Sequence, residues 1–73
     1  MNAFTTFYFK TGYETLIPLI NNIESAFPVE ISDGGYFFNA YTKDKKLLQD
    51  IEVLIYYWSK KYPHIQLEEV SHD

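Results

Sequence analysis

The sequence predicts an α+β fold in which one four-stranded antiparallel sheet packs against two helices. Three observations support this prediction. A chain of 73 residues has room for one domain only, spanning residues 1–73. Four short segments combine aromatic and β-branched residues as strands do, and two longer segments carry apolar residues at helical spacing. The aromatic residues, seven Tyr, six Phe and one Trp, fall mainly on the strand segments.

Four strands are expected, two of them joined in a hairpin. Residues 3–10 are aromatic and β-branched and too short for a helix, so they form the first strand. Residues 29–32 and 36–42 flank Asp-Gly-Gly at 33–35, a turn signal that predicts a β-hairpin. Residues 64–70 alternate apolar and polar side chains and predict a last strand at the edge of the sheet.

The first helix is expected between Gly12 and Pro28. Thr11 and Glu14 have the spacing of an N-terminal capping box. Pro18 is harmless only in a first turn, so it predicts that regular helix begins near Glu14 or the next residue, or that the helix is kinked at the proline. The apolar positions of this helix are Leu16, Leu19, Ile20, Ile23 and Phe27.

The second helix is expected from Asp44 to the residue before Pro63. Its apolar stripe consists of Leu47, Leu48, Ile51, Leu54, Ile55, Trp58 and Tyr62. Beyond the last strand, residues 71–73 are expected to fray.

The resulting order, βαββαβ, is that of a ferredoxin-like sandwich with spatial strand order 4-1-3-2 and both helices on one face of the sheet. The first and third strands are then central. Asn39 interrupts one parity of the third strand, so we expect Tyr36, Phe38 and Ala40 to face the helices. Phe7 is expected to join them, together with Phe9 of the same strand.

The opposite parity predicts an exposed aromatic patch on the uncovered face of the sheet. Rigid aromatic side chains bury a large area at small entropic cost, so such a patch indicates a protein-binding or homodimerisation surface. We expect the contact residues to be Phe4, Tyr8, Phe37 and Tyr41, with Glu30 and Glu68 supplying charge at the rim.

Charge and composition limit the partners. The net charge of −4 and the pI near 4.9 oppose binding to nucleic-acid phosphates or anionic lipids and favour a basic protein partner. The chain lacks cysteine, a signal-peptide pattern and an apolar run long enough to span a membrane. We therefore expect a soluble cytoplasmic protein that does not associate with membranes.

A second interpretation rests on Gly35-Tyr36-Phe37-Phe38-Asn39-Ala40-Tyr41, which resembles the central octapeptide of RNA-recognition motifs. The resemblance implies the same fold and base-stacking roles for Tyr36 and Phe38. It requires the strand parity opposite to the one inferred above. RNA or single-stranded DNA binding is thus the alternative to protein binding.

A third pattern lies at the end of the second helix. Trp58-Ser59-Lys60-Lys61-Tyr62-Pro63, followed by His64-Ile65-Gln66-Leu67, resembles the last helix and strand of a ferredoxin-like domain of uncharacterised phage and plasmid proteins. The resemblance implies a mobile-element origin, hence the host-cell cytoplasm, and a role in binding and blocking a host protein. It implies no catalytic residue.

No enzymatic chemistry is expected. Without cysteine or a recognisable Ser-His-acid arrangement the chain has no candidate nucleophile, and we predict no catalytic residue, no cofactor and no metal site. His64 and His72 are interpreted as exposed residues. The sequence thus predicts a small acidic, homodimeric protein-binding module. We expect it to be a phage or mobile-element inhibitor of the anti-defence or nuclease-inhibitor type, which binds and blocks a host protein, for example a basic or nucleic-acid-handling one. A homodimeric structural protein is a further alternative.

Overall fold

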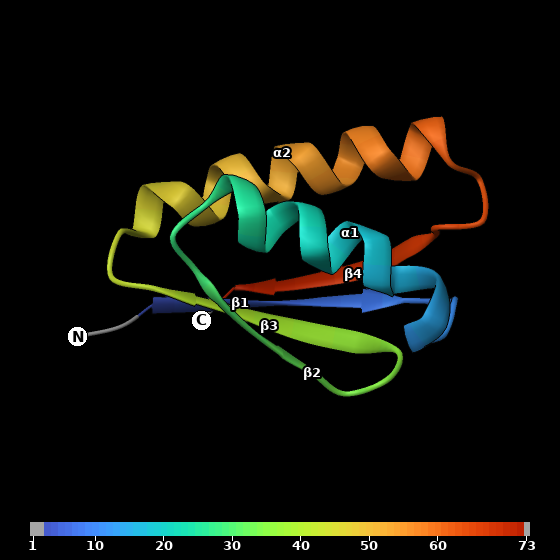
Figure 1. Cartoon of the computed structure of the whole chain (residues 1–73), viewed down its shortest axis with the longest axis horizontal. Coiled ribbons are helices and arrows are strands. Elements are labelled where there is room, and N and C mark those ends of the chain that lie inside the picture. Colours follow the sequence, from blue (N-terminus) through green and yellow to red (C-terminus); the bar gives the residue numbers. More distant parts are fainter. Residues whose placement is uncertain (1–2, 73) are drawn as a thin grey trace.

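The computed structural model describes residues 3–72 and contains the predicted succession of elements. These are β1 (Ala3–Phe9), α1 (Tyr13–Ala26), β2 (Glu30–Asp33), β3 (Phe37–Thr42), α2 (Lys45–Lys61) and β4 (Leu67–His72). The strands form one sheet in the order β2-β3-β1-β4, with every neighbouring pair antiparallel. Both helices lie on the same side of this sheet (Figure 1). The predicted ferredoxin-like fold is therefore confirmed.

The core lies between the helices and one face of the central strands. Phe7 and Phe38 face each other across β1 and β3 with ring centroids 5.5 Å apart, and Phe9 stacks on Phe38 at 5.4 Å. All three rings are almost completely buried. The helices cover them with Leu16, Leu19, Ile20, Ile23, Leu48, Ile51 and Ile55. The predicted inward parity of both central strands is thus correct.

Tyr36 is an exception, because it was expected in this core and is 64% exposed. It precedes β3, in the turn that begins at Gly34, and its ring lies beside Gly12. Its carbonyl oxygen still accepts a hydrogen bond from the Phe9 N–H at 2.7 Å. The backbone of Tyr36 is therefore held against β1, while its side chain lies beyond the end of the helical cover.

Helix α2 has the ends that the sequence predicts. The Asp44 side chain caps its N-terminus by accepting a hydrogen bond from the Lys46 N–H at 3.0 Å. At the other end the Tyr62 N–H donates to the carbonyl oxygen of Trp58, and Pro63 follows. Lys60 and Lys61 lie in the last turn, where positive charge interacts favourably with the helix dipole.

Helix α1 starts differently from the prediction. Its N-cap is Gly12, which makes no side-chain cap, and the first turn closes when the Thr15 N–H donates to the Gly12 carbonyl oxygen. Thr11 therefore lies one residue too early for a capping box, and its hydroxyl oxygen is buried without a hydrogen-bond partner. Because the helix already begins at Tyr13, Pro18 lies inside it, beyond the first turn.

The last strand is displaced toward the C-terminus. The Ile65 N–H donates to the Tyr62 carbonyl oxygen in a turn that buries Ile65 in the core, so β4 starts only at Leu67. Ser71 and His72, which were expected to fray, pair with β1. The same expectation for Asp73 lies outside the described residues. The edge position of β4 is as predicted.

The interior proline of α1 has a measurable cost. Pro18 has no N–H, so it cannot donate to the Glu14 carbonyl oxygen, and it is exposed, so its ring adds little to the core. We expect Pro18→Ala to raise the free energy of unfolding by about 2 kcal/mol, the restored helix outweighing the greater freedom of the unfolded chain. Urea denaturation measures the difference.

The matched control is Asn22→Ala, one turn further along the same exposed side of α1. It changes helix propensity alone and should add about 0.5 kcal/mol. A Pro18→Ala protein no more stable than the Asn22→Ala protein would contradict this explanation.

Candidate functional site

The side of the sheet opposite the helices carries the candidate site. No described part of the chain packs over it (Figure 1). Successive residues of a strand point to opposite sides, so the partners of the buried residues on β1 and β3 project here. We call this surface the open sheet face; its residues are Phe4, Thr6, Tyr8, Glu30, Ser32, Phe37, Asn39, Tyr41, Glu69 and Ser71.

Two aromatic pairs occupy the middle of the open sheet face. Phe4 lies opposite Tyr41 with ring centroids 5.4 Å apart, and Tyr8 lies opposite Phe37 at 5.8 Å. All four side chains are at least partly exposed, Tyr8 most clearly at 37%. The four predicted contact aromatics thus project from the same side of the two central strands.

A polar row separates the two aromatic pairs. Thr6 lies opposite Asn39, and its hydroxyl donates a hydrogen bond to the Asn39 side-chain oxygen. Ser32 and Ser71 continue this row on the outer strands. The hydrogen bond joins the two polar side chains at the centre of the open sheet face, between the aromatic pairs.

Acidic side chains frame the aromatics. Glu30 on β2 lies opposite Tyr41, as expected for a rim residue. Between Phe9 and Tyr8 the register to β4 shifts from Leu67 to Glu69, so the predicted rim residue Glu68 lies in the irregularity and Glu69 takes the place beside Tyr8. The open sheet face therefore carries two carboxylates, and no lysine is among its residues.

The open sheet face has an internal two-fold pattern. A half-turn about the sheet normal between Thr6 and Asn39 exchanges β1 with β3 and β2 with β4. It places like residues on like residues except at the centre, where it exchanges Thr6 with Asn39. The exchanged pairs are Phe4 and Phe37, Tyr8 and Tyr41, Glu30 and Glu69, Ser32 and Ser71.

This pattern has a sequence signal that the strand-by-strand interpretation missed. Residues 4–8 and 37–41 both read Phe-x-x-x-Tyr, and residues 30–32 and 69–71 read Glu-Ile-Ser and Glu-Val-Ser. Each motif pair occupies equivalent strands of the two β-α-β halves. The shared residues face the open side, whereas the core residues between them differ in size, as Phe7 and Ala40 do.

Gly34 shapes one end of the open sheet face. A Cβ atom at this position would overlap the Phe37 ring, so the ring can lie across the backbone only because residue 34 is glycine. The following Gly35 has φ +94°, a conformation that favours glycine. The two glycines therefore serve both the turn and the placement of Phe37.

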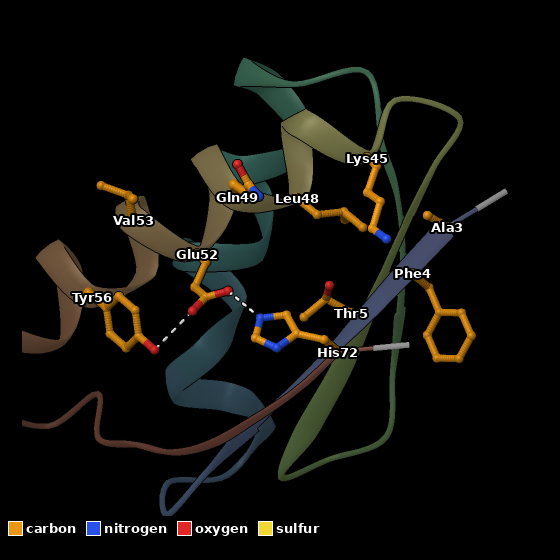
Figure 2. A pocket seen from close by; sticks show the side chains of 10 residues that line it. All are labelled: Ala3, Phe4, Thr5, Lys45, Leu48, Gln49, Glu52, Val53, Tyr56 and His72. Carbon is orange, nitrogen blue, oxygen red and sulfur yellow. Dashed lines mark hydrogen bonds and ion pairs between the residues drawn. The ribbon is translucent and has the colours of Figure 1, made fainter.

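A groove of about 500 Å³ lies between α2 and the ends of β1 and β4, and Phe4 of the open sheet face is among its lining residues (Figure 2). Glu52 crosses it: one carboxylate oxygen pairs with His72 Nε2 at 2.7 Å, and the other accepts a hydrogen bond from the Tyr56 hydroxyl at 3.0 Å. This second bond is the main reason that the pKa of Tyr56 is raised. The cluster ties β4 to α2.

Within residues 3–72 no group of three or more His, Asp or Glu side chains is arranged to hold a metal ion. His64 lies against the Tyr62 ring, away from the Glu52–His72 pair. We assign the Glu52 cluster to the attachment of an edge strand.

The strand parity also bears on base stacking. Phe38, which the RNA-recognition resemblance places on the binding surface, is fully buried between the sheet and the helices. Tyr36 is exposed but lies outside β3. The two side chains to which that resemblance assigns base stacking therefore do not share the open sheet face.

The chain matches no known protein-family model, no curated protein and no solved structure. In the part of the chain from Ala3 to His72, neither helix is long and apolar enough to cross a membrane.

The two faces of the sheet should differ in their contribution to stability. Losing both exposed aromatic pairs, as in the Tyr8→Ser, Tyr41→Ser double variant, should lower the free energy of unfolding by about 2 kcal/mol. Phe38→Ala removes a fully buried ring and should cost about 4 kcal/mol. Chemical denaturation followed by circular dichroism compares the variants. A double variant as unstable as Phe38→Ala would show that the exposed aromatics serve folding.

Proposed function

We propose that this chain is a protein-binding module whose contact surface is the open sheet face. The observation that carries the proposal is the pair of aromatic contacts, Phe4 with Tyr41 and Tyr8 with Phe37, on a sheet face that the helices do not cover. Tyrosine and phenylalanine are rigid and large, which makes them effective contact residues. A surface of this kind is suited to an apolar patch on another protein.

The charge on the open sheet face supports a basic protein partner. Glu30 and Glu69 frame the aromatics, and the chain as a whole carries a net charge of −4. Lysine or arginine at the edge of the partner's patch would pair with these carboxylates and speed association. The same charges repel a phosphate backbone, so they favour a protein over RNA or single-stranded DNA.

Three expectations from the sequence are narrower than this proposal and stay predictions. They are the inhibition of a host protein, the mobile-element origin and the homodimer. The proposal requires none of them, because it concerns only the surface that makes contact and not the effect of binding on the partner.

A comparative pull-down tests the proposal. Immobilised wild-type protein should retain one or more proteins from a lysate, and the Tyr8→Ser, Tyr41→Ser variant should lose them, because both aromatic pairs are broken. Tyr36→Ser is the matched control: it removes an exposed tyrosine that lies off the open sheet face and should retain the same proteins. Mass spectrometry identifies and quantifies what is bound.

Circular dichroism must first show that each variant is folded. Equal retention by the wild type and the double variant would contradict the proposal, as would loss of binding by Tyr36→Ser alone. Fluorescence anisotropy with a short labelled RNA at low salt tests the nucleic-acid alternative, for which we expect no binding.

A further inference from the structure

A second exposed surface lies on the far side of the molecule. The side of α2 opposite the buried Leu48, Ile51 and Ile55 carries large apolar side chains, Val53 being 67% and Tyr57 56% exposed. Lysines stand at both ends of this stripe. We call it the outer face of α2; its residues are Lys46, Val53, Tyr57 and Lys60.

The charge of the chain is divided between the two surfaces. All lysines except Lys10 lie between Lys43 and Lys61, on α2 or next to it, whereas the open sheet face carries only acids. One acid, Asp50, lies on the same side of α2 as Val53, one turn from Lys46. The outer face of α2 therefore has an exposed apolar middle and a lysine at each end, with Asp50 between Lys46 and Val53.

The spacing of the charges also matches. Glu30 and Glu69, at diagonally opposite corners of the open sheet face, lie about 20 Å apart, given strand spacings of about 4.8 Å and about 3.3 Å per residue. Lys46 and Lys60 lie about 21 Å apart along α2, at about 1.5 Å per residue. A helix laid along this diagonal would place its lysines at the carboxylates and its apolar middle over Thr6 and Asn39, between the two aromatic pairs.

We propose that the open sheet face of one copy binds the outer face of α2 of the next copy, so that the chain associates head to tail. The inference rests on the proposed function, since it takes the open sheet face as a protein-binding surface, and it names a second copy as the partner. A half-turn exchanges Glu30 with Glu69 on the open sheet face. A half-turn about Val53 likewise exchanges Lys46 with Lys60 on the helix.

The arrangement has consequences that a closed dimer lacks. The two surfaces lie on opposite sides of the molecule, because α2 covers the other face of the sheet (Figure 1). When two copies bind through these unlike surfaces, one open sheet face and one outer face of α2 stay free at the two ends of the complex. Further copies can therefore bind at either end. Ion pairs at the rim make the association weaken as the salt concentration rises.

Two variants separate the surfaces. The sheet variant, Glu30→Lys with Glu69→Lys, reverses the charges of the open sheet face and keeps the outer face of α2. The helix variant, Val53→Glu with Tyr57→Glu, places acids in the outer face of α2 and keeps the open sheet face. All four positions are exposed, and circular dichroism checks that both variants fold.

Sedimentation equilibrium at low salt gives the expected results. The wild type should gain mass with concentration without reaching a plateau, and each variant alone should associate at least about tenfold more weakly. An equimolar mixture of the variants should form a complex of one copy of each, because one intact sheet face meets one intact helix. The control for the sheet variant is Glu14→Lys with Glu24→Lys, which makes the same change in net charge on α1 and should associate like the wild type.

Three results would overturn the inference. A wild type that stays monomeric at high micromolar concentration overturns it and leaves the pull-down test of the proposed function intact. A closed dimer that the sheet variant abolishes and the helix variant retains overturns the head-to-tail arrangement while keeping the open sheet face as the contact surface. Self-association that the sheet variant retains in full overturns the assigned role of the open sheet face as well.

Discussion

The antiparallel pairing of β1 with β3 is the interaction on which the rest of the structure depends. Its register places Phe7 opposite Phe38 on the helical side and Phe4 opposite Tyr41 on the other. A shift of one residue would exchange these faces and put the core rings into solvent. One pairing therefore determines both how the short chain buries a core and which aromatics it presents to a partner.

The fold relates the positions of the open sheet face by a two-fold axis. Two β-α-β halves meet through antiparallel central strands, so equivalent residues of the halves fall at positions related by a half-turn. Apart from Thr6 and Asn39, the halves agree where residues face the open side, and they differ at core positions such as Phe7 and Ala40. Folding alone does not require that agreement, because the helices do not cover those side chains. It is a property of the surface, and it is the reason that the carboxylates lie at opposite corners.

The sequence was sufficient to predict the element order, the strand order and the inward parity of β1 and β3, because Asn39 marks the open side of a strand rich in aromatics. It was insufficient at the element ends. The first turn of α1 closes on Gly12, one residue after the apparent capping threonine, and the turn at Ile65 delays β4. The bulge opposite Tyr8 then moves Glu69 to the place expected for Glu68, a shift that only three-dimensional pairing determines.

The central claim is that the two sets of aromatic rings lie on opposite faces of the sheet. The most direct test is the broadening of ring-proton NMR signals by a neutral, soluble gadolinium chelate at low protein concentration. The structure predicts strong broadening for Tyr8, Phe37 and Tyr41 and protection for Phe7 and Phe38. Strong broadening of Phe38 with protection of Phe37 and Tyr41 would contradict the account, because β3 would then present its other side to solvent.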